Sequence, residues 1–435
     1  MTDSILWESE VGKLGRFAES VKHLNHNVQN WRRGKPNWDR RGVSVSMMGD
    51  LVANVYTGER YDTNCCAIVP HIESDLAPLW AYCSSSDFQR EVRSNNNNMK
   101  IEVGTILNTK IDMGKWREVA AKRFLEGVPE PYSDDVTQWL FHGHPAKADK
   151  GSGLHVALAR LCGYRWPAET DEDMRLAAEA RHCITSAMTL PSADNDGLLA
   201  LPAVAGEKPL ADRLRAYLAA AFSPDWSDTL ERRLVAEADV ILDKKMARDG
   251  SLEAWLRDRA FRQHCALFHQ RPFVWHIWDG LKDGFSVFVH YHRFDQATLR
   301  KLTYTMLGDW LARAKAESND LRYEKGRELQ QTLEKILEGE KPYDIFVRWK
   351  SLADQPLGWD PDIDDGVRMN IRPFVTAGVL REQPKIKWTK DRGTDVASAP
   401  WYSVFKGERI NDHHTTLAEK KAAREPIKIR AEAAQ

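Results

Sequence analysis

Aromatic and β-branched residues are concentrated in residues 271–295, RPFVWHIWDGLKDGFSVFVHYHRFD. The pattern predicts two strands, at 273–278 and 285–291, joined by a turn that contains Asp-Gly at 279–280 and 283–284. Aromatic residues at a spacing of two usually belong to a core, so we expect a half-buried hairpin. A ribbon that faces nucleic acid is the alternative.

Most other hydrophobic positions recur every three or four residues, which is typical of amphipathic helices. Helices are predicted in residues 76–92, from near Trp116, in 154–185 and in 208–269. Residues 297–337 predict a long charged helix, a spacer or an antiparallel coiled-coil arm, with Gly326 as the candidate break. Near the N-terminus an apolar stripe predicts a helix that docks on a partner chain, through Val11, Leu14, Phe17, Val21 and Leu24.

Short strands are predicted in residues 43–56, 64–70 and 101–113, and a helix cap at 84–87. Residues 346–416 are rich in Trp, Pro and Gly and predict mostly non-helical structure before a short helix from Leu417. The fold class is therefore α+β. The predicted segments are a mixed α+β domain at 1–150, a helical connector at 151–265, the hairpin with the long helix at 266–345, and an irregular, basic, Trp-rich lobe at 346–435.

Composition is that of an ordinary globular protein: 435 residues, 42% of them hydrophobic, allow two or three domains with sizeable cores. The 62 Lys and Arg nearly balance the 63 Asp and Glu, so any nucleic-acid surface must be local. We find neither a long apolar run nor a signal peptide and expect a cytoplasmic protein without a membrane span. The six cysteines lack a CxxC pair and are expected to be buried thiols.

Motifs for catalysis or metal binding are weak. His142 and His144 have no further ligand nearby, and the aspartates of 360–366 miss the register of a calcium loop because its twelfth position is Ile371. A nuclease motif with Asp362 and Glu382 lacks its lysine at the required spacing. No phosphate-binding glycine motif, nucleophile elbow or Asn-Pro-Pro-Tyr element occurs. We therefore expect no catalytic residue, no metal and no cofactor on this chain.

Several long strings resemble the C-terminal part of large adenine-specific DNA methyltransferases, the type IIG-like enzymes of phage-defence systems of the BREX and DISARM kind. They include RPFVWHIWDGLKDGFSVFVHYH, ILEGEKPYDIFVRWK, QPLGWDPDIDDGVRMNIRPFVTAGVLREQPKIKWTKDRG and GERINDHHTTLAEKKAARE. The earlier strings CCAIVP, LWAYCSSSDFQREVR and EVGTILNTKIDM resemble a target-recognition domain and half of a type I specificity subunit.

The resemblance implies a DNA sequence-recognition subunit of a split adenine-N6 methyltransferase in restriction-modification or phage defence. The family's catalytic core is missing from the sequence, so S-adenosylmethionine is expected on a partner chain that methylates while this chain clamps double-stranded DNA. Expected partners are the DNA, the methyltransferase catalytic subunit and other phage-defence proteins. The alternatives are a protein-interaction scaffold of a defence complex and a nuclease-associated remnant of a fused methyltransferase.

Candidate DNA contacts follow from side-chain chemistry. Between Gly366 and Arg409 nine Lys or Arg outnumber four acids, an excess typical of phosphate contact. The candidates there are Lys385, Lys387, Trp388, Lys390 and Arg392. Asparagine amides can hydrogen-bond adenine edges, although a run of them can also be a plain loop. The base-reading candidates are Asn95, Asn96, Asn97, Asn98 and Lys100, with Arg271 and Lys282 from the hairpin.

Overall fold

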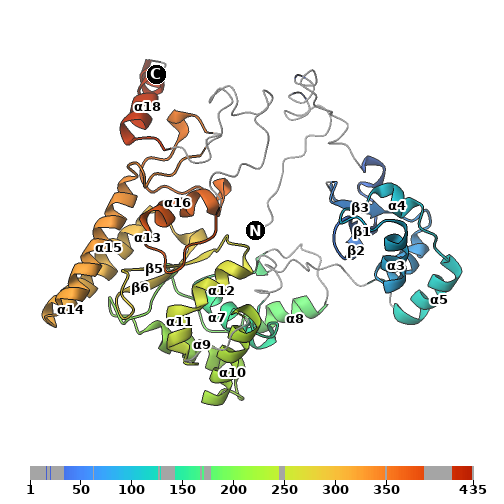
Figure 1. Ribbon diagram of the computed structural model, residues 1–435, viewed down its shortest axis with the longest axis horizontal. Coiled ribbons are helices and arrows are strands. Elements are labelled where there is room, and N and C mark those ends of the chain that lie inside the picture. Colours follow the sequence, from blue (N-terminus) through green and yellow to red (C-terminus); the bar gives the residue numbers. More distant parts are fainter. Residues whose placement is uncertain are drawn as a thin grey trace. The chain divides into compact units, whose positions relative to one another are not determined.

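The computed structural model describes residues 16, 20, 34–61, 63–125, 128, 143–166, 169–170, 178–243, 250–347, 350–386 and 414–433. It is a mixed α+β protein, as predicted, with small antiparallel sheets (Figure 1). The chain divides into two compact units. The first is Met1–Ser133 with Asp173–Arg181, and the second is Asp134–Glu172 with His182–Gln435.

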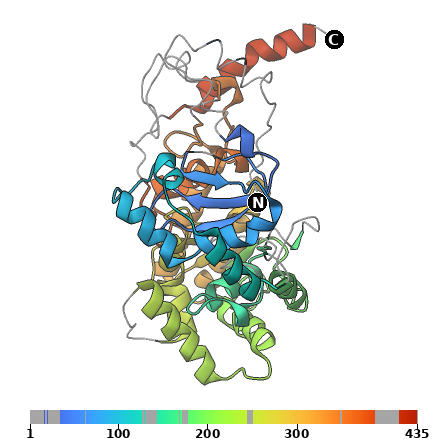
Figure 2. The same ribbon diagram turned by 90° about the vertical axis from the view of Figure 1, so that its right-hand side faces the viewer.

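The first unit is built on a three-stranded sheet of order β2-β1-β3, whose strands Figure 2 shows as blue arrows. The strands are β1 (Gly42–Ser46), β2 (Ala53–Tyr56) and β3 (Cys65–Ile68), which confirms the strands predicted there. Val43 and Val45 of the central strand are fully buried, and Val45 pairs with Ala53 on one side and Cys66 on the other. The alternation of buried and more exposed positions along β1 is the pattern of a sheet with one face on a core.

Four helices follow the sheet between residues 76 and 123: α2 (Leu76–Cys83), α3 (Ser86–Asn95), α4 (Val103–Leu107) and α5 (Met113–Arg123). The predicted cap is confirmed, because the Ser85 hydroxyl accepts a hydrogen bond from the backbone N–H of Phe88 at 3.3 Å. The strand predicted at 101–113 is wrong. Its β-branched residues favour a strand locally, but α4 forms there and turns Ile106 into the core, so tertiary packing overrides the local preference.

The second unit is organised around the predicted hairpin. Its sheet has the order β4-β6-β5, with β4 (Leu198–Ala200), β5 (Val274–Trp278) and β6 (Ser286–His290). β5 and β6 pair from Val274 opposite His290 to Trp278 opposite Ser286. Both faces of the hairpin are covered, since neighbouring Trp275 and His276 are each 0% exposed. The core interpretation is confirmed, but nearly every strand residue of the hairpin is buried, where a half-buried hairpin was predicted.

Helices surround this sheet before and after the hairpin. Those before it are α7 (Gly153–Leu161), α9 (Leu210–Phe222), α10 (Asp228–Ala238), α11 (Leu252–Asp258) and α12 (Ala260–Leu267). A further helix, α8 (Ala178–Ala187), begins in residues of the first unit and ends in the second. Those after it are α13 (Gln296–Arg300), α14 (Leu307–Ala316), α15 (Asp320–Glu338), α16 (Val367–Ala377) and α18 (Leu417–Ala433). The helix predicted from 154 to 185 is not continuous, because α7 ends at Leu161 and Gly163 follows with φ of 102°.

The long charged helix predicted at 297–337 is interrupted, but not at Gly326. The chain turns at Ser318, whose φ is 54°, and α15 packs beside α14 as an antiparallel partner (Figure 1). A Cβ at Gly326 would lie 3.0 Å from a Leu311 side-chain carbon, so this glycine permits close helix packing and breaks nothing. The apolar face of α15, including Leu333 and Ile336, is buried.

Residues 346–416 contain a helix that the sequence pattern did not predict. Pro373 lies inside α16, where a proline normally ends a helix because it lacks an N–H and its ring clashes with the preceding turn. Ile371 and Phe374 on either side are fully buried, and this packing favours the helix despite the proline. The helix predicted from Leu417 is confirmed as α18.

One hydrophobic core joins the parts of the second unit. It contains residues from Leu154 to Leu380, so the segments predicted at 151–265, 266–345 and 346–435 all contribute to it. The six cysteines are free thiols; four are buried, as predicted, and Cys65 and Cys183 are half-buried. No helix in the described residues has the length and apolar character of a membrane span. The helix residues predicted to dock a partner, Val11, Leu14, Phe17, Val21 and Leu24, lie outside the described residues.

Candidate nucleic-acid interface

The first candidate surface is the asparagine loop, residues 95–100, which connects α3 to α4 in the first unit. Asn95 is the last residue of α3, and Asn97, Asn98, Met99 and Lys100 are exposed. The loop ends at Ile101, whose side chain is buried. It is thus an exposed polar segment between two anchored ends.

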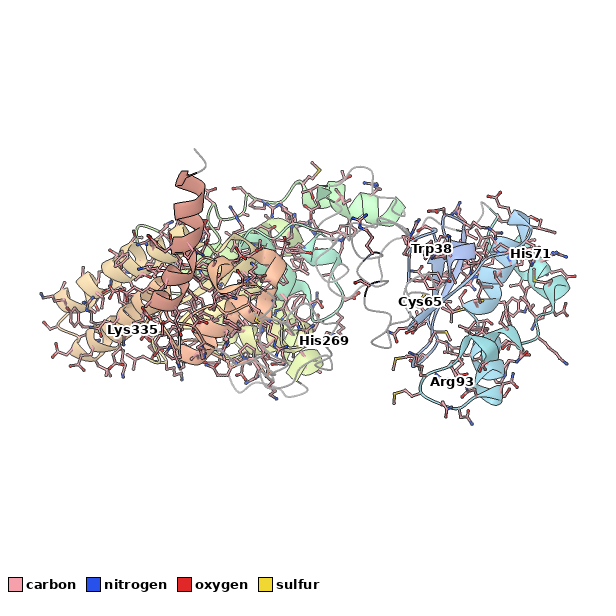
Figure 3. All side chains as sticks on the ribbon, turned by 90° about the horizontal axis from the view of Figure 1, so that it is seen from above. Trp38, Cys65, His71, Arg93, His269 and Lys335 are labelled. Atoms are coloured by element: carbon pink, nitrogen blue, oxygen red, sulfur yellow. The ribbon has the colours of Figure 1, made fainter. Side chains whose placement is uncertain are left out.

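Arg93 holds the loop in place. The guanidinium of Arg93, a residue labelled in Figure 3, donates hydrogen bonds to the backbone carbonyls of Asn98 in the loop and Gly49 in the turn between β1 and β2. Next to it, Met48 and Lys100 form an isolated β-bridge, and the Ile101 N–H donates to the Met47 carbonyl at 2.8 Å. These hydrogen bonds connect the loop to the segment between β1 and β2.

The four asparagines do not share one role. Asn96 is half-buried, accepts a hydrogen bond from the Asn98 N–H at 2.9 Å and donates to the Thr105 hydroxyl at 3.3 Å, so its amide stabilises the loop. In the described part of the chain, the side-chain amides of Asn95, Asn97 and Asn98 form no hydrogen bond. Three of the four predicted amides are thus available to a ligand.

The chemistry of these groups suits a base edge. A side-chain amide can accept from the N6 amino group of adenine and donate to its N7 at the same time. Lys100 adds a positive charge at the end of the loop and donates to Asn64 Oδ1 at 3.3 Å. Because the backbone is already fixed by Arg93, little conformational entropy would be lost when the amides bind.

The second candidate surface belongs to the second unit and follows the hairpin. Arg271 precedes β5 and Lys282 lies in the turn after it, so a strand's length of roughly 20 Å separates them. The two predicted hairpin contacts therefore do not form one cluster. Each lies at its own end of the strand.

A second predicted DNA contact, Lys385, lies near Arg271. The backbone N–H of Lys385 donates to Oε1 of Gln270, the neighbour of Arg271, at 2.9 Å. This occurs because residues 379–381 run along β5, where the Trp278 N–H donates to the Val379 carbonyl at 3.0 Å. Both Arg271 and Lys385 are exposed, and neither has an ion-pair partner within the described ranges.

At the Lys282 end a hollow of about 350 Å³ is lined by Lys282, Arg257, Arg322 and Trp310, with Glu253 and Asp283 opposing their charge. Beside it, the guanidinium carbon of Arg381 lies 3.9 Å from the ring centre of Trp278, and the same group pairs with Asp258 at 2.7 Å. These arginines are largely neutralised. Sequence reasoning missed them because only tertiary contacts bring them to the turn.

The remaining predicted contacts, Lys387, Trp388, Lys390 and Arg392, lie outside the described residues, as does His142 of the weak metal pair. Where the chain is described, no group of three His, Cys, Asp or Glu side chains could hold a metal ion. Two aspartates of the 360–366 segment form ion pairs instead. Asp362 and Asp365 pair with Lys350, at 2.9 and 2.5 Å.

Replacing Lys282, Arg271 or Lys385 by alanine is expected to weaken DNA binding equally on all sequences. The logarithm of the affinity falls linearly with the logarithm of the salt concentration. Each substitution that removes a phosphate contact should make this negative slope shallower by about 1. Lys335, labelled in Figure 3, is the matched control, because it is an exposed lysine of α15 that belongs to neither end of the hairpin. Anisotropy titrations at several salt concentrations measure the slope. A slope unchanged by all three substitutions contradicts the prediction.

No protein-family model matches this chain, and no curated protein is significantly similar to it in sequence.

Proposed function

We propose that this chain is a DNA sequence-recognition subunit of a split adenine-N6 methyltransferase. The observation that carries the proposal is the asparagine loop, in which a structural Asn96 and the Arg93 guanidinium present three amides without partners in the described chain. A side-chain amide is the group that reads the N6 and N7 atoms of adenine in the major groove. The resemblance of the long strings to methyltransferase C-terminal regions supports the same function.

The division of labour follows from the chemistry of base methylation. A methyltransferase must read a site and also take one adenine out of the base stack, and these tasks use different surfaces. This chain would supply the reading surface and exposed cations such as Lys282 and Lys385 for phosphates. A partner chain would bind S-adenosylmethionine and transfer the methyl group.

The test starts with capture of partners from the native host, using this chain as bait. The eluate is assayed for adenine methylation with S-adenosylmethionine, and a duplex library is selected on the same complex for a common site. We expect one enriched site, and methylation that is lost when this chain is depleted. If no methylation activity is captured and no site is enriched, the proposal fails.

Replacing Asn97 and Asn98 together by alanine should lower affinity for the selected site by about 5- to 150-fold for each amide that hydrogen-bonds an adenine. Binding to unrelated duplexes should stay the same, because the phosphate contacts remain. Asn108 at the end of α4 is the control, since it is also exposed and belongs to the same unit. Equal reductions in affinity for selected and unrelated duplexes would show that the loop does not read bases.

A further inference from the structure

Exposed apolar side chains border the asparagine loop. Met99 is 75% exposed and Met48 is 43% exposed, and Met48 forms a β-bridge with Lys100, the residue that follows Met99. Single exposed apolar residues are common on protein surfaces. Two exposed methionines so close in the structure to the amides of the asparagine loop need a more specific explanation.

Met99 occupies a distinctive position in the loop. It lies between Asn98, whose amide has no hydrogen bond among the described residues, and Lys100, whose ammonium can reach a phosphate. Arg93 fixes the Asn98 carbonyl and therefore the backbone that carries Met99. Met99 is thus an exposed apolar side chain next to a backbone carbonyl that Arg93 holds by a hydrogen bond.

We propose that Met99 is a wedge that enters the duplex between two base pairs next to the bases that the loop reads. The inference rests on the proposed DNA-recognition function. Apolar side chains such as Met and Leu unstack a base step when they insert, and they kink the duplex. The long, unbranched Met side chain with its polarisable sulfur adapts well to the faces of the separated bases.

The wedge gives the chain a task beyond reading sequence. Unstacking a base step lowers the remaining cost of extruding a neighbouring adenine, which the catalytic partner must do before it can methylate. Flexible pyrimidine–purine steps cost the least to open. We therefore expect such a step, for example TA or CA, beside the adenines in the selected site.

The alternative occupant of this edge is a protein. Val103 and Leu107 of α4 are also exposed, one turn apart on the same face of the helix, and they could extend an apolar docking surface. The observations favour DNA for the methionines, because free amides and a lysine surround Met99, whereas a protein-docking surface is apolar at its centre. The experiment separates the two by measuring partner binding as well as DNA bending.

The experiment uses the full chain with its captured partner and the selected duplex, labelled at both ends for energy transfer and carrying 2-aminopurine at the candidate step. Wild type should bring the ends closer and raise 2-aminopurine fluorescence on binding. Met99→Ala should abolish both signals and lower affinity for the selected duplex by about 10-fold. Met99→Leu, which keeps an apolar wedge, should retain them. Met188→Ala is the control, because Met188 is equally exposed but lies directly after α8, in the second unit.

Bending and fluorescence that persist in Met99→Ala overturn the wedge while leaving the recognition function standing. Loss of partner capture in Met99→Ala or Leu107→Ala, with bending intact, also overturns it and assigns the edge to protein docking. If wild type enriches no duplex, the recognition function itself fails. These results are distinguishable, because the selection is completed before any Met99 variant is made.

Discussion

Replacing Asp344 by alanine is expected to lower the free energy of unfolding by about 3–5 kcal/mol, because it removes one partner from a buried charge cluster. Asp344 is 0% exposed. Its carboxylate accepts hydrogen bonds from His414 Nδ1 at 2.6 Å and from the Thr415 N–H at 3.1 Å. The Lys420 ammonium, also fully buried, lies 3.8 Å away. Without the carboxylate, this buried ammonium would lose the anion that lies nearest to it in the described residues.

The cluster fixes the C-terminal helix to the second unit. Lys420 of α18 donates to the carbonyls of Ile345 at 3.1 Å and Pro356 at 3.0 Å, while Arg372 of α16 lies 2.8 Å from His414 Nε2. Burial alone would raise the pKa of Asp344, but the hydrogen bonds from His414 and Thr415 bring it below its usual value. The carboxylate therefore stays charged, and its contribution to stability is lost only as the pH falls through this lowered pKa.

Chemical denaturation measures the loss of stability, and hydrogen exchange in α18 shows whether the helix is released first. Asp364→Ala is the control, because Asp364 is an exposed aspartate of the same unit. Lys420→Met should cost less than Asp344→Ala, since a side chain of similar length then fills the site without a charge. A loss below about 1 kcal/mol for Asp344→Ala would contradict the prediction.

The elements that sequence predicted well carry their signals locally. The hairpin has turn residues between two aromatic strands, and the start of α3 has a serine three residues before the N–H that it caps. The elements it predicted badly depend on distant contacts. α16 forms around Pro373 because Ile371 and Phe374 are buried, and Gly326 serves packing against Leu311, which no local rule separates from a helix break.

The candidate site divides in the same way. Asparagine chemistry indicates the loop, but the inward role of Asn96 depends on Thr105, and Arg93 reaches the Gly49 carbonyl 44 residues away. The approach of Lys385 to Gln270 crosses 115 residues. Sequence could therefore nominate side chains by type. Which of them face a ligand and which hold the others in place depends on tertiary structure.

Acidification from pH 6.5 to pH 5 is expected to destabilise the second unit through histidines buried in the hairpin. Burial, with the nearby Arg381 charge, lowers the pKa of His276 to about 3, and burial with His292 and Arg293 lowers that of His290 to about 3. Both stay neutral in the fold, whereas the unfolded chain takes up a proton on each below about pH 6.5. Because the unfolded state binds more protons, stability falls as the pH falls, by about 1.4 kcal/mol per pH unit for each histidine.

His276→Phe should reduce this pH dependence by about 1.4 kcal/mol per pH unit, because it removes one of several buried histidines that take up a proton only in the unfolded chain. The ring of His276 stacks on that of Phe288, with 4.1 Å between the ring centres. Neither ring nitrogen of His276 has a hydrogen-bond partner in the described residues. Phenylalanine at this position should therefore also stabilise the fold near pH 7. Denaturation curves at pH 7, 6 and 5 give the slope. His269→Asn, at an exposed site whose φ of 50° asparagine tolerates, should leave it unchanged. Equal slopes for wild type and His276→Phe would show that the acid sensitivity arises elsewhere.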